Sequence, residues 1–405
     1  MKRTLTILSL TLLLCSCGGS PVNVKPGKTL PKWKEGWLDI HSINTGRGES
    51  TLYIFPDGTT MLVDASGAEI PKKGQELACA PRPSGKYLSE KVINRYLDRY
   101  LPKESEGGID YFMLSHFHED HMGKTSLIEV GKAHPYRTVI DRGAPDSRAS
   151  SAWFDEAGRE RMDKYAKFLA WSALEYGTVH ESMKVGHDDQ ITLLHKASKY
   201  PSFAIRNLAA GGNYWTGEGV EVDSTYMPTP AECYEYGRGS HSKAAPKINE
   251  NIFSCVFQLS YGKFDWYSGG DLMYKHREII PWFDAELPVS KVVKRTDAMK
   301  MNHHGTGGSN GPELCRALKP TVALASTWKT VQPNPATLKT LFKASPDVAL
   351  FVTNWSGDDD RVVASNGHIV IRVEPGGDRY WVLALDDSNF KYRVKGVYGP
   401  YESKE

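Results

Sequence analysis

The sequence predicts a layered α/β domain, on three observations. Apolar patterning defines two β-rich halves, each built from a hairpin, a helix and a further strand. The last strand of each half leads into a cluster of histidines. Of the 405 residues, 40% are hydrophobic and 24% are charged, which is ordinary globular usage and excludes a disordered or multi-span membrane protein. We therefore expect a folded domain over about residues 37–355.

The first half begins where apolar residues start to alternate. Residues 38–43 predict a strand, and residues 50–55 and 60–64 predict a hairpin across a Pro-Asp-Gly turn. Residues 87–101 carry apolar side chains at helical spacing. The short apolar run 109–114 predicts a buried strand that ends just before the first histidine cluster.

The second half repeats this order. It predicts a hairpin, a helix and then a strand that leads into paired histidines, over residues 253–259, 264–267, 273–283 and 298–301. Short helices and strands continue to alternate over residues 313–318, 321–326, 336–342 and 348–353. Such alternation is typical of sheets covered by helices.

Two further segments accompany this pattern. A long insertion, about residues 144–248, separates the halves and contains a helix near residues 156–176, followed by a stretch rich in Gly, Pro, Tyr and Ser. Residues 356–405 alternate strongly on both sides of a Pro-Gly-Gly turn. This last segment predicts a small C-terminal β extension.

The N-terminus has the pattern of an export signal. Two basic residues precede an apolar run of about ten residues, which is too short to span a bilayer permanently. A Leu-Cys-Ser-Cys sequence that ends at Cys17 resembles the bacterial lipobox, which implies a lipoprotein signal peptide over residues 1–16 and a lipid on the Cys17 thiol. An ordinary signal peptide cut nearby is the alternative. Residues 17–36 would then be a linker, and we expect an exported protein anchored to a bacterial membrane on its periplasmic or cell-surface side.

Charge and cysteine content limit the possible partners. The formal net charge is +2, and loss of the two basic residues of the signal peptide leaves none, so no overall basic field exists to hold a polyanion. No protein partner can be inferred. Cys255 and Cys315 lie in apolar patterns and are expected to be buried, whereas pairing between Cys79 and Cys233 stays open.

The strongest chemical signal follows the strand predicted at residues 109–114. His116, His118 and His121 lie with Asp120 within six residues. At a strand end, His116 and His118 point the same way, whereas Asp120 and His121 turn toward a neighbouring position. Imidazole and carboxylate groups are ligands that divalent metals of intermediate softness favour, so one stretch can serve two adjacent ions. A solvated surface cluster is the alternative.

His116, His118, Asp120 and His121 resemble the His-x-His-x-Asp-His signature of the metallo-β-lactamase superfamily. The resemblance covers about residues 37–355. It implies a four-layer αββα sandwich with the metal site at one edge of the two sheets. It also implies two divalent metal ions as cofactors, with zinc favoured and manganese as an alternative.

Further segments match the other motifs of that superfamily. Asp64 resembles the first motif, whose carboxylate supports the metal loop from behind the ligands. Asp271 resembles the fourth motif, whose aspartate bridges both ions. His303 and His304 precede a glycine, as in the branch that contains the competence-type DNA-uptake domain and the phosphorylcholine esterases. The resemblance favours His304 as a ligand and His303 as a donor or proton shuttle, and the reverse assignment stays open.

The sequence departs from the superfamily at its third motif. Asn251 stands about twenty residues before Asp271, where a histidine is usual, and the competence-type branch has the same Asn-x-x-Ser pattern. The metal position of His116 and His118 would then have the bridging Asp271 and a weak amide ligand or none, which lowers its affinity for zinc and leaves manganese or partial occupancy open. His241, on the insertion, is an alternative ligand.

Together these residues predict a metal-dependent hydrolase with a metal-bound hydroxide as nucleophile. Asp120 would orient or deprotonate the water, His303 would stabilise charge on the leaving side, and Trp328 would contact the substrate. The resemblance favours a phosphodiester or phosphate ester substrate, either a small molecule or a nucleic acid. A lactone or β-lactam hydrolase and a non-catalytic surface binding protein are the alternatives.

Overall fold

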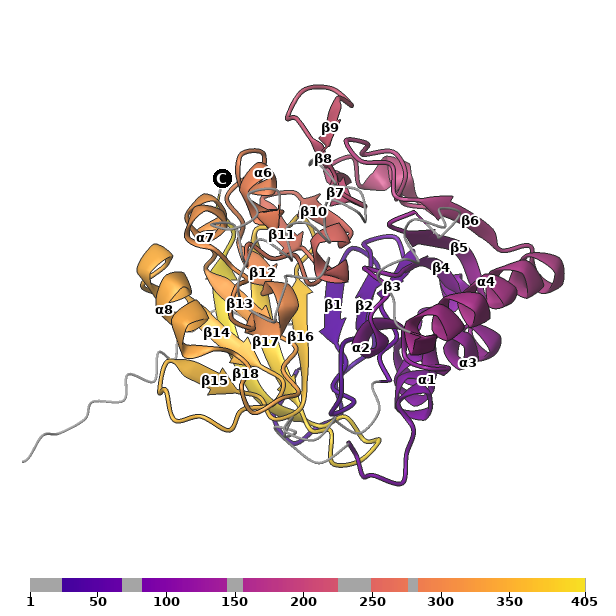
Figure 1. Cartoon of the computed structure of the whole chain (residues 1–405). Helices are drawn as coiled ribbons and strands as arrows, with labels where there is room; N and C mark the ends of the chain where they lie inside the picture. Colours follow the sequence, from indigo (N-terminus) through magenta and orange to yellow (C-terminus); the bar gives the residue numbers. More distant parts are fainter. Residues whose placement is uncertain (1–23, 68–81, 144–155, 225–248, 276–282, 405) are drawn as a thin grey trace, which may run out of the picture.

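The computed structural model describes residues 24–67, 82–143, 156–224, 249–275 and 283–404 (Figure 1). The expected signal peptide at residues 1–16, Cys17, the Cys79 and Cys233 pair and His241 lie outside this part of the chain. Among the described helices, none has the length and apolar character that crossing a membrane requires.

In the part of the chain that the structure describes, two nine-stranded sheets form the centre of the fold (Figure 1). The first has the order β18-β17-β16-β1-β2-β3-β4-β5-β6. Its strands are β1 (Leu38–Ser42), β2 (Thr51–Ile54), β3 (Thr60–Val63), β4 (Ile109–Met113), β5 (Tyr136–Asp141), β6 (Val179–Ser182), β16 (His368–Val373), β17 (Arg379–Leu385) and β18 (Val394–Glu402). The second has the order β15-β14-β13-β12-β11-β10-β7-β8-β9. Its strands are β7 (Phe203–Ala210), β8 (Asn213–Trp215), β9 (Val222–Ser224), β10 (Val256–Tyr261), β11 (Phe264–Ser268), β12 (Ala298–Lys300), β13 (Val322–Ala325), β14 (Ala349–Val352) and β15 (Val362–Ala364).

Helices cover both outer faces of this pair of sheets (Figure 1). On the first sheet, apolar side chains of α1 (Ser89–Tyr100), α3 (Ser126–Ala133) and α4 (Glu156–Tyr176) share one core with the strands. On the second sheet, α6 (Glu286–Ser290), α7 (Pro312–Leu318) and α8 (Pro335–Ala344) do the same. The four-layer αββα sandwich predicted from the sequence is therefore confirmed. The other short helices among the described residues are α2 (Glu119–Met122), η1 (Lys103–Ser105), η2 (Ala197–Lys199), η3 (Glu250–Phe253) and η5 (Asn302–Gly305).

The facing sides of the sheets share a third apolar core. Tyr53 of the first sheet packs edge-on against Phe257 of the second, with 5.9 Å between ring centroids. The Trp266 indole N–H donates a hydrogen bond of 3.1 Å to the Tyr53 hydroxyl. Burial of a large apolar side chain contributes roughly 1.5–3 kcal/mol to the free energy of folding, so these buried rings help to hold the two sheets together. Cys255 belongs to this core and is buried, as the sequence predicts.

The segment expected to be a linker is packed against the domain from residue 24 onward, which corrects that expectation. Leu30 is fully buried, and Val24 is nearly so. Thr29 forms a β-bridge with Arg393, and the Gly27 amide donates to the Val394 carbonyl. These backbone contacts and two apolar anchors hold the segment against the strand that begins at Val394.

The expected C-terminal extension is instead part of the sandwich. The predicted hairpin exists as β16 and β17, but β16 pairs with β1 in the interior of the first sheet, and β15 joins the second sheet. Arg372 on β16 is 4% exposed and forms a bidentate ion pair with Asp39 on β1, at 2.7 and 2.8 Å. Two complementary buried charges therefore join strands that lie far apart in sequence.

The long insertion also supplies strands to the sandwich. The helix predicted near residues 156–176 is confirmed as α4. After it, β6 lies at the edge of the first sheet, and β7 pairs along its length with β10 of the second. The segment is not only a cover, because its apolar residues contribute to the core between the sheets.

Parallel strands bring the predicted site residues to one edge of the fold. The pairs β3 and β4 in the first sheet and β11 and β12 in the second are parallel. Parallel neighbours have their carboxyl ends at the same edge of a sheet. The loops after these four strands carry Asp64, the 116–121 segment, Asp271 and the paired histidines.

Loss of the charge at Arg372 tests the role of the C-terminal strands. Arg372→Met should lower the free energy of unfolding by about 3–5 kcal/mol, because it leaves the Asp39 carboxylate buried beside no guanidinium. Urea unfolding of the purified protein measures this. Arg379→Met is the matched control, since Arg379 forms an exposed ion pair with Glu374 on the same hairpin. Equal losses in both variants would contradict the assignment.

Candidate metal centre

Left-handed backbone conformations direct the paired histidines into the site. His303 and His304, in η5, have φ values of 50° and 55°. Asp64 also has a left-handed backbone, with φ of 60°. Such conformations cost roughly 1–3 kcal/mol for residues with a side chain, and they persist where the surrounding structure enforces them. Their concentration here is typical of a functional site.

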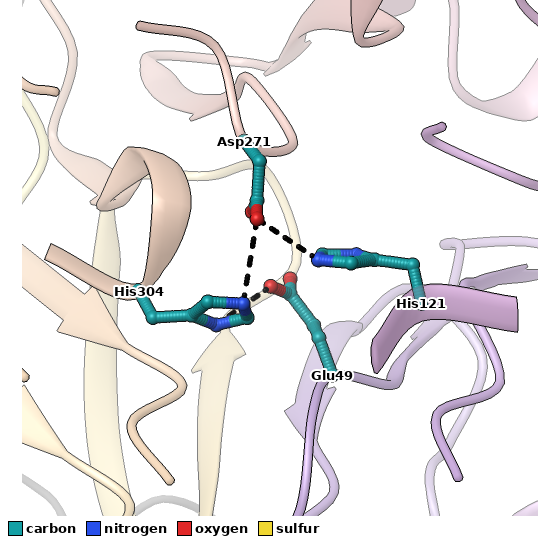
Figure 2. Close-up of side chains that lie close together, drawn as sticks. All are labelled: Glu49, His121, Asp271 and His304. Carbon is teal, nitrogen blue, oxygen red and sulfur yellow. Dashed lines mark ion pairs between the residues drawn. The ribbon is translucent and has the colours of Figure 1, made fainter. Parts of the chain in front are cut away.

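Four imidazoles surround one carboxylate oxygen, Asp271 Oδ2. The Nε2 atoms of His121, His304, His303 and His116 lie 3.1, 3.5, 3.8 and 3.9 Å from it. Figure 2 shows His121 and His304 approaching Asp271 from the two sides of the cluster. The ligands predicted in the first half of the chain and those predicted in the second half therefore come together at Asp271.

One group of donors is enclosed on all sides. Four buried residues each place one possible ligand atom, a ring nitrogen or a carboxylate oxygen, within 4.8 Å of the other three: Glu49, His121, Asp271 and His304 (Figure 2). Asp120 Oδ2 lies 3.5 Å from His304 Nε2. Within the described structure, His121 Nε2, His304 Nε2 and Asp271 Oδ1 have no hydrogen-bond partner. Buried polar atoms without partners are costly, and a divalent cation would satisfy them.

A second group of side chains lies around His116 and His303, which also approach Asp271 Oδ2. His116 Nε2 is 3.1 Å from His118 Nδ1. Asn251, the residue expected as a weak ligand, places its amide nitrogen 3.2 Å from His303 Nε2, while its buried Oδ1 has no partner among the described residues. The structure thus brings Asn251 against His303 at this end of the cluster.

Outer contacts fix which imidazole nitrogen faces the site. Asp64 Oδ2 lies 2.7 Å from His121 Nδ1, and its carboxylate also accepts hydrogen bonds from the Ser115 amide and hydroxyl. His304 Nδ1 lies 2.8 Å from the Ser326 carbonyl oxygen, to which it donates. Both contacts place the proton on Nδ1 and leave Nε2 available as a metal ligand.

The titration behaviour follows from this packing. Burial raises the pKa of Asp120 and Asp271, but the imidazoles of His121 and His304 outweigh it and hold both pKa values well below their usual range. Burial, together with the charge on His121, lowers the pKa of His116 well below that of a free histidine. The two aspartates are therefore ionised at neutral pH and His116 is neutral, which are the forms that bind metals.

The charges of the donor set fit divalent cations. Among the described residues, the four carboxylates of Asp64, Asp120, Asp271 and Glu49 lie around one ammonium group, that of Lys300. Burial raises the pKa of Glu49. Burial lowers the pKa of His121, but Asp271 and Asp64 outweigh it and hold that pKa well above its usual range. Carboxylates still outnumber cationic side chains in this buried site, and divalent cations would neutralise them.

Sequence reasoning missed two residues of this cluster. Glu49 follows a Gly-Arg-Gly turn, where a lone carboxylate looks like a surface residue. Lys300 lies inside β12, which is buried along its whole length. A charged residue within a buried strand is the signal that could have identified Lys300, because an unpaired ammonium is rarely buried.

Trp328, expected as a substrate contact, lies against the cluster rather than at the surface. It is 4% exposed, and its ring packs edge-on against His304 with 6.4 Å between centroids. The Lys329 ammonium lies 4.1 Å from the centre of the Trp328 ring. Trp328 therefore lies beside His304, and its contact with a substrate stays a prediction.

No protein-family model matches the chain, and no curated protein matches it by sequence. Solved structures give distant likenesses. A diiron beta-hydroxylase from Streptomyces venezuelae is 14% identical, with a TM-score of 0.36, over 78% of this chain and 48% of the other. The isothiocyanate hydrolase from Delia radicum gut bacteria is 13% identical, with a TM-score of 0.33, over 78% and 84%. An archaeal metallo-beta-lactamase superfamily protein from Sulfolobus tokodaii is 16% identical, with a TM-score of 0.24, over 60% and 65%. Likenesses this distant assign no activity, so function must be argued from the site.

The paired histidines should differ in their effect on metal content. His304→Ala should lose metal on dialysis, because its buried Nε2 faces both Asp120 and Asp271. His303→Ala should retain metal near the wild-type level, because its side chain is 22% exposed and contacts the Asn251 amide. Elemental analysis after dialysis against a weak chelator measures both variants. The opposite pattern would exchange the two roles.

Proposed function

We propose that this protein is an exported metal-dependent hydrolase of the metallo-β-lactamase superfamily that cleaves a phosphodiester or phosphate ester. The observation that carries the proposal is the convergence of four imidazoles on Asp271 Oδ2, in a buried site with excess negative charge. The donor set is the one that borderline divalent metals favour.

Two divalent ions fit the arrangement. Asp120, His121, Asp271 and His304 would hold one ion, and His116 and His118 would hold the other, with Asp271 between them. Nitrogen and oxygen donors suit zinc, and the weak amide of Asn251 at the second position keeps manganese open. When bound, such ions lower the pKa of a coordinated water toward neutrality.

Two partly exposed side chains are placed to act on a substrate. The Asp120 side chain is 18% exposed and can accept a hydrogen bond from the attacking water and so orient it. The His303 imidazole is 22% exposed and can donate a hydrogen bond to the leaving oxygen. The deeper His121 and His304 are fully buried and hold the site together instead.

The Asn-x-x-Ser motif supports a phosphate ester substrate through its resemblance to the competence-type branch. Here it also has a local structural role. The Ser254 hydroxyl accepts a hydrogen bond of 3.0 Å from the Asp271 amide and donates one of 2.9 Å to the Asn251 carbonyl. This motif therefore orients the aspartate between the two proposed metal positions, rather than supplying a third imidazole.

A substrate panel tests the proposal. Purified protein loaded with zinc or manganese should hydrolyse bis-p-nitrophenyl phosphate or p-nitrophenyl phosphorylcholine, and Asp271→Asn should abolish this turnover, because it weakens the carboxylate between the ions. A chelator should remove the activity, and added metal should restore it. Preferential turnover of a β-lactam or a lactone would favour that alternative. Metal binding without turnover of any ester or lactam would favour a binding protein.

Export and lipid anchoring are a separate part of the proposal and rest on the N-terminal sequence. Cys17→Ala should move the protein from the membrane fraction to the soluble fraction while its specific hydrolase activity stays unchanged, because acyl chains and not the domain would supply membrane affinity. Cell fractionation followed by immunoblotting measures the distribution. Persistent membrane association of the variant would contradict the lipobox interpretation.

A further inference from the structure

A buried ion pair adjoins the proposed metal centre without belonging to the predicted ligand set. Lys300 Nζ lies 3.0 Å from Glu49 Oε2, and the two side chains are 3% and 1% exposed. Glu49 comes from the loop between β1 and β2 of the first sheet, and Lys300 from β12 of the second. The pair therefore joins the two sheets directly beside the site.

The Glu49 backbone is held to the first ligand loop. Its amide donates a hydrogen bond of 2.9 Å to the Asp120 carbonyl, and its carbonyl accepts one of 2.9 Å from the Ser66 amide. Gly48 makes this approach possible, because a Cβ there would lie 2.1 Å from the Asp120 oxygen. Any shift of Glu49 would therefore move the loop that carries Asp120 and His121.

The Lys300 side chain is held to the second ligand loop. Its ammonium donates a hydrogen bond of 2.5 Å to the Gly270 carbonyl, which also accepts one of 3.1 Å from the His303 amide. The same ammonium lies 3.8 Å from Asp271 Oδ1. Lys300 thus contacts both the Gly270 carbonyl and the Asp271 carboxylate of this loop.

The Glu49 carboxylate lies close to the two buried histidines and is held by Lys300. Figure 2 shows it between the rings of His304 and His121. Its Oε2 is 3.7 Å from His304 Nδ1, whereas His304 Nε2 faces Asp120 and Asp271. The oxygen that pairs with the Lys300 ammonium therefore lies toward His304 Nδ1, the nitrogen at which an outer carboxylate supports a metal-binding histidine.

We propose that Glu49 and Lys300 are a positioning pair, which fixes the loop of Asp120 and His121 relative to the loop of Asp271, so that side chains from both loops can hold the proposed metal ions. The inference rests on the proposed metal centre. It assigns the pair no contact with substrate. It explains why an ammonium is buried where cations are expected to bind, although its charge repels them.

Whether Lys300→Met raises or lowers the affinity for zinc distinguishes a positioning role from simple charge balance. If Lys300 only balanced charge, its loss would raise zinc affinity, because one positive charge would be removed from beside Asp271. If it positions the loops, its loss should lower zinc affinity at least about tenfold, in the range seen when outer contacts of metal ligands are removed. Glu49→Gln should lower the affinity by a similar factor. Competition between the purified full chain and a zinc chelator measures each value.

A double variant separates positioning from general stability. Glu49→Gln with Lys300→Met leaves no lone buried charge, so the thermal midpoint of the metal-free protein should recover relative to the single variants. Its zinc affinity should nevertheless stay at least about tenfold below wild type. If the single variants fail to fold, a folded double variant decides the question alone.

The control is the buried ion pair of Asp39 and Arg372, which joins two strands within one sheet. Asp39→Asn with Arg372→Met should shift the thermal midpoint and leave zinc affinity unchanged. Recovery of both stability and zinc affinity in the Glu49 and Lys300 double variant, or a rise in affinity in Lys300→Met, would overturn the inference. Wild-type protein that binds no zinc or manganese would overturn the metal centre itself.

Discussion

Several carboxylates lie buried at one edge of two packed sheets, and a buried carboxylate is tolerated only beside a cation or strong donors. The local structure follows from this constraint. Asp64 accepts three hydrogen bonds, and Asp271 lies among four imidazoles. The left-handed turns at His303 and His304 bring two rings toward the same oxygen. Rigid strands beneath these loops are necessary, because a displacement of about 1 Å is enough to impair a metal site.

Much of the fold could be predicted because its signals are local. The alternation at residues 50–55 and 60–64 and the helical spacing at residues 87–101 correspond to β2, β3 and α1. The ligand motif could be recognised for the same reason, since His116 to His121 are nearly contiguous and follow a short apolar strand. Local periodicity and short motifs are the information that a single sequence contains most directly.

What could not be predicted depends on pairing between distant residues. The alternation of residues 368–373 predicts a strand but does not specify β1 as its neighbour, and Leu30 gives no pattern that would place it in a core. Glu49 and Lys300 are 251 positions apart, and only the packing of the two sheets makes them partners. The register of a sheet and the pairing of buried charges are properties of the assembled fold, which local patterns do not determine.

The position of β16 beside β1 affects when this molecule can fold. During synthesis from the N-terminus, β1 can pair with β2 as soon as both have been made. Its other edge stays unpaired until residue 373 has been made. An open edge in a partly formed sheet attracts other strands, and contacts so distant in sequence form slowly. The first sheet therefore reaches its native order only after residue 373 has been made. Until then, the free edge of β1 is open to pairing with strands of other chains.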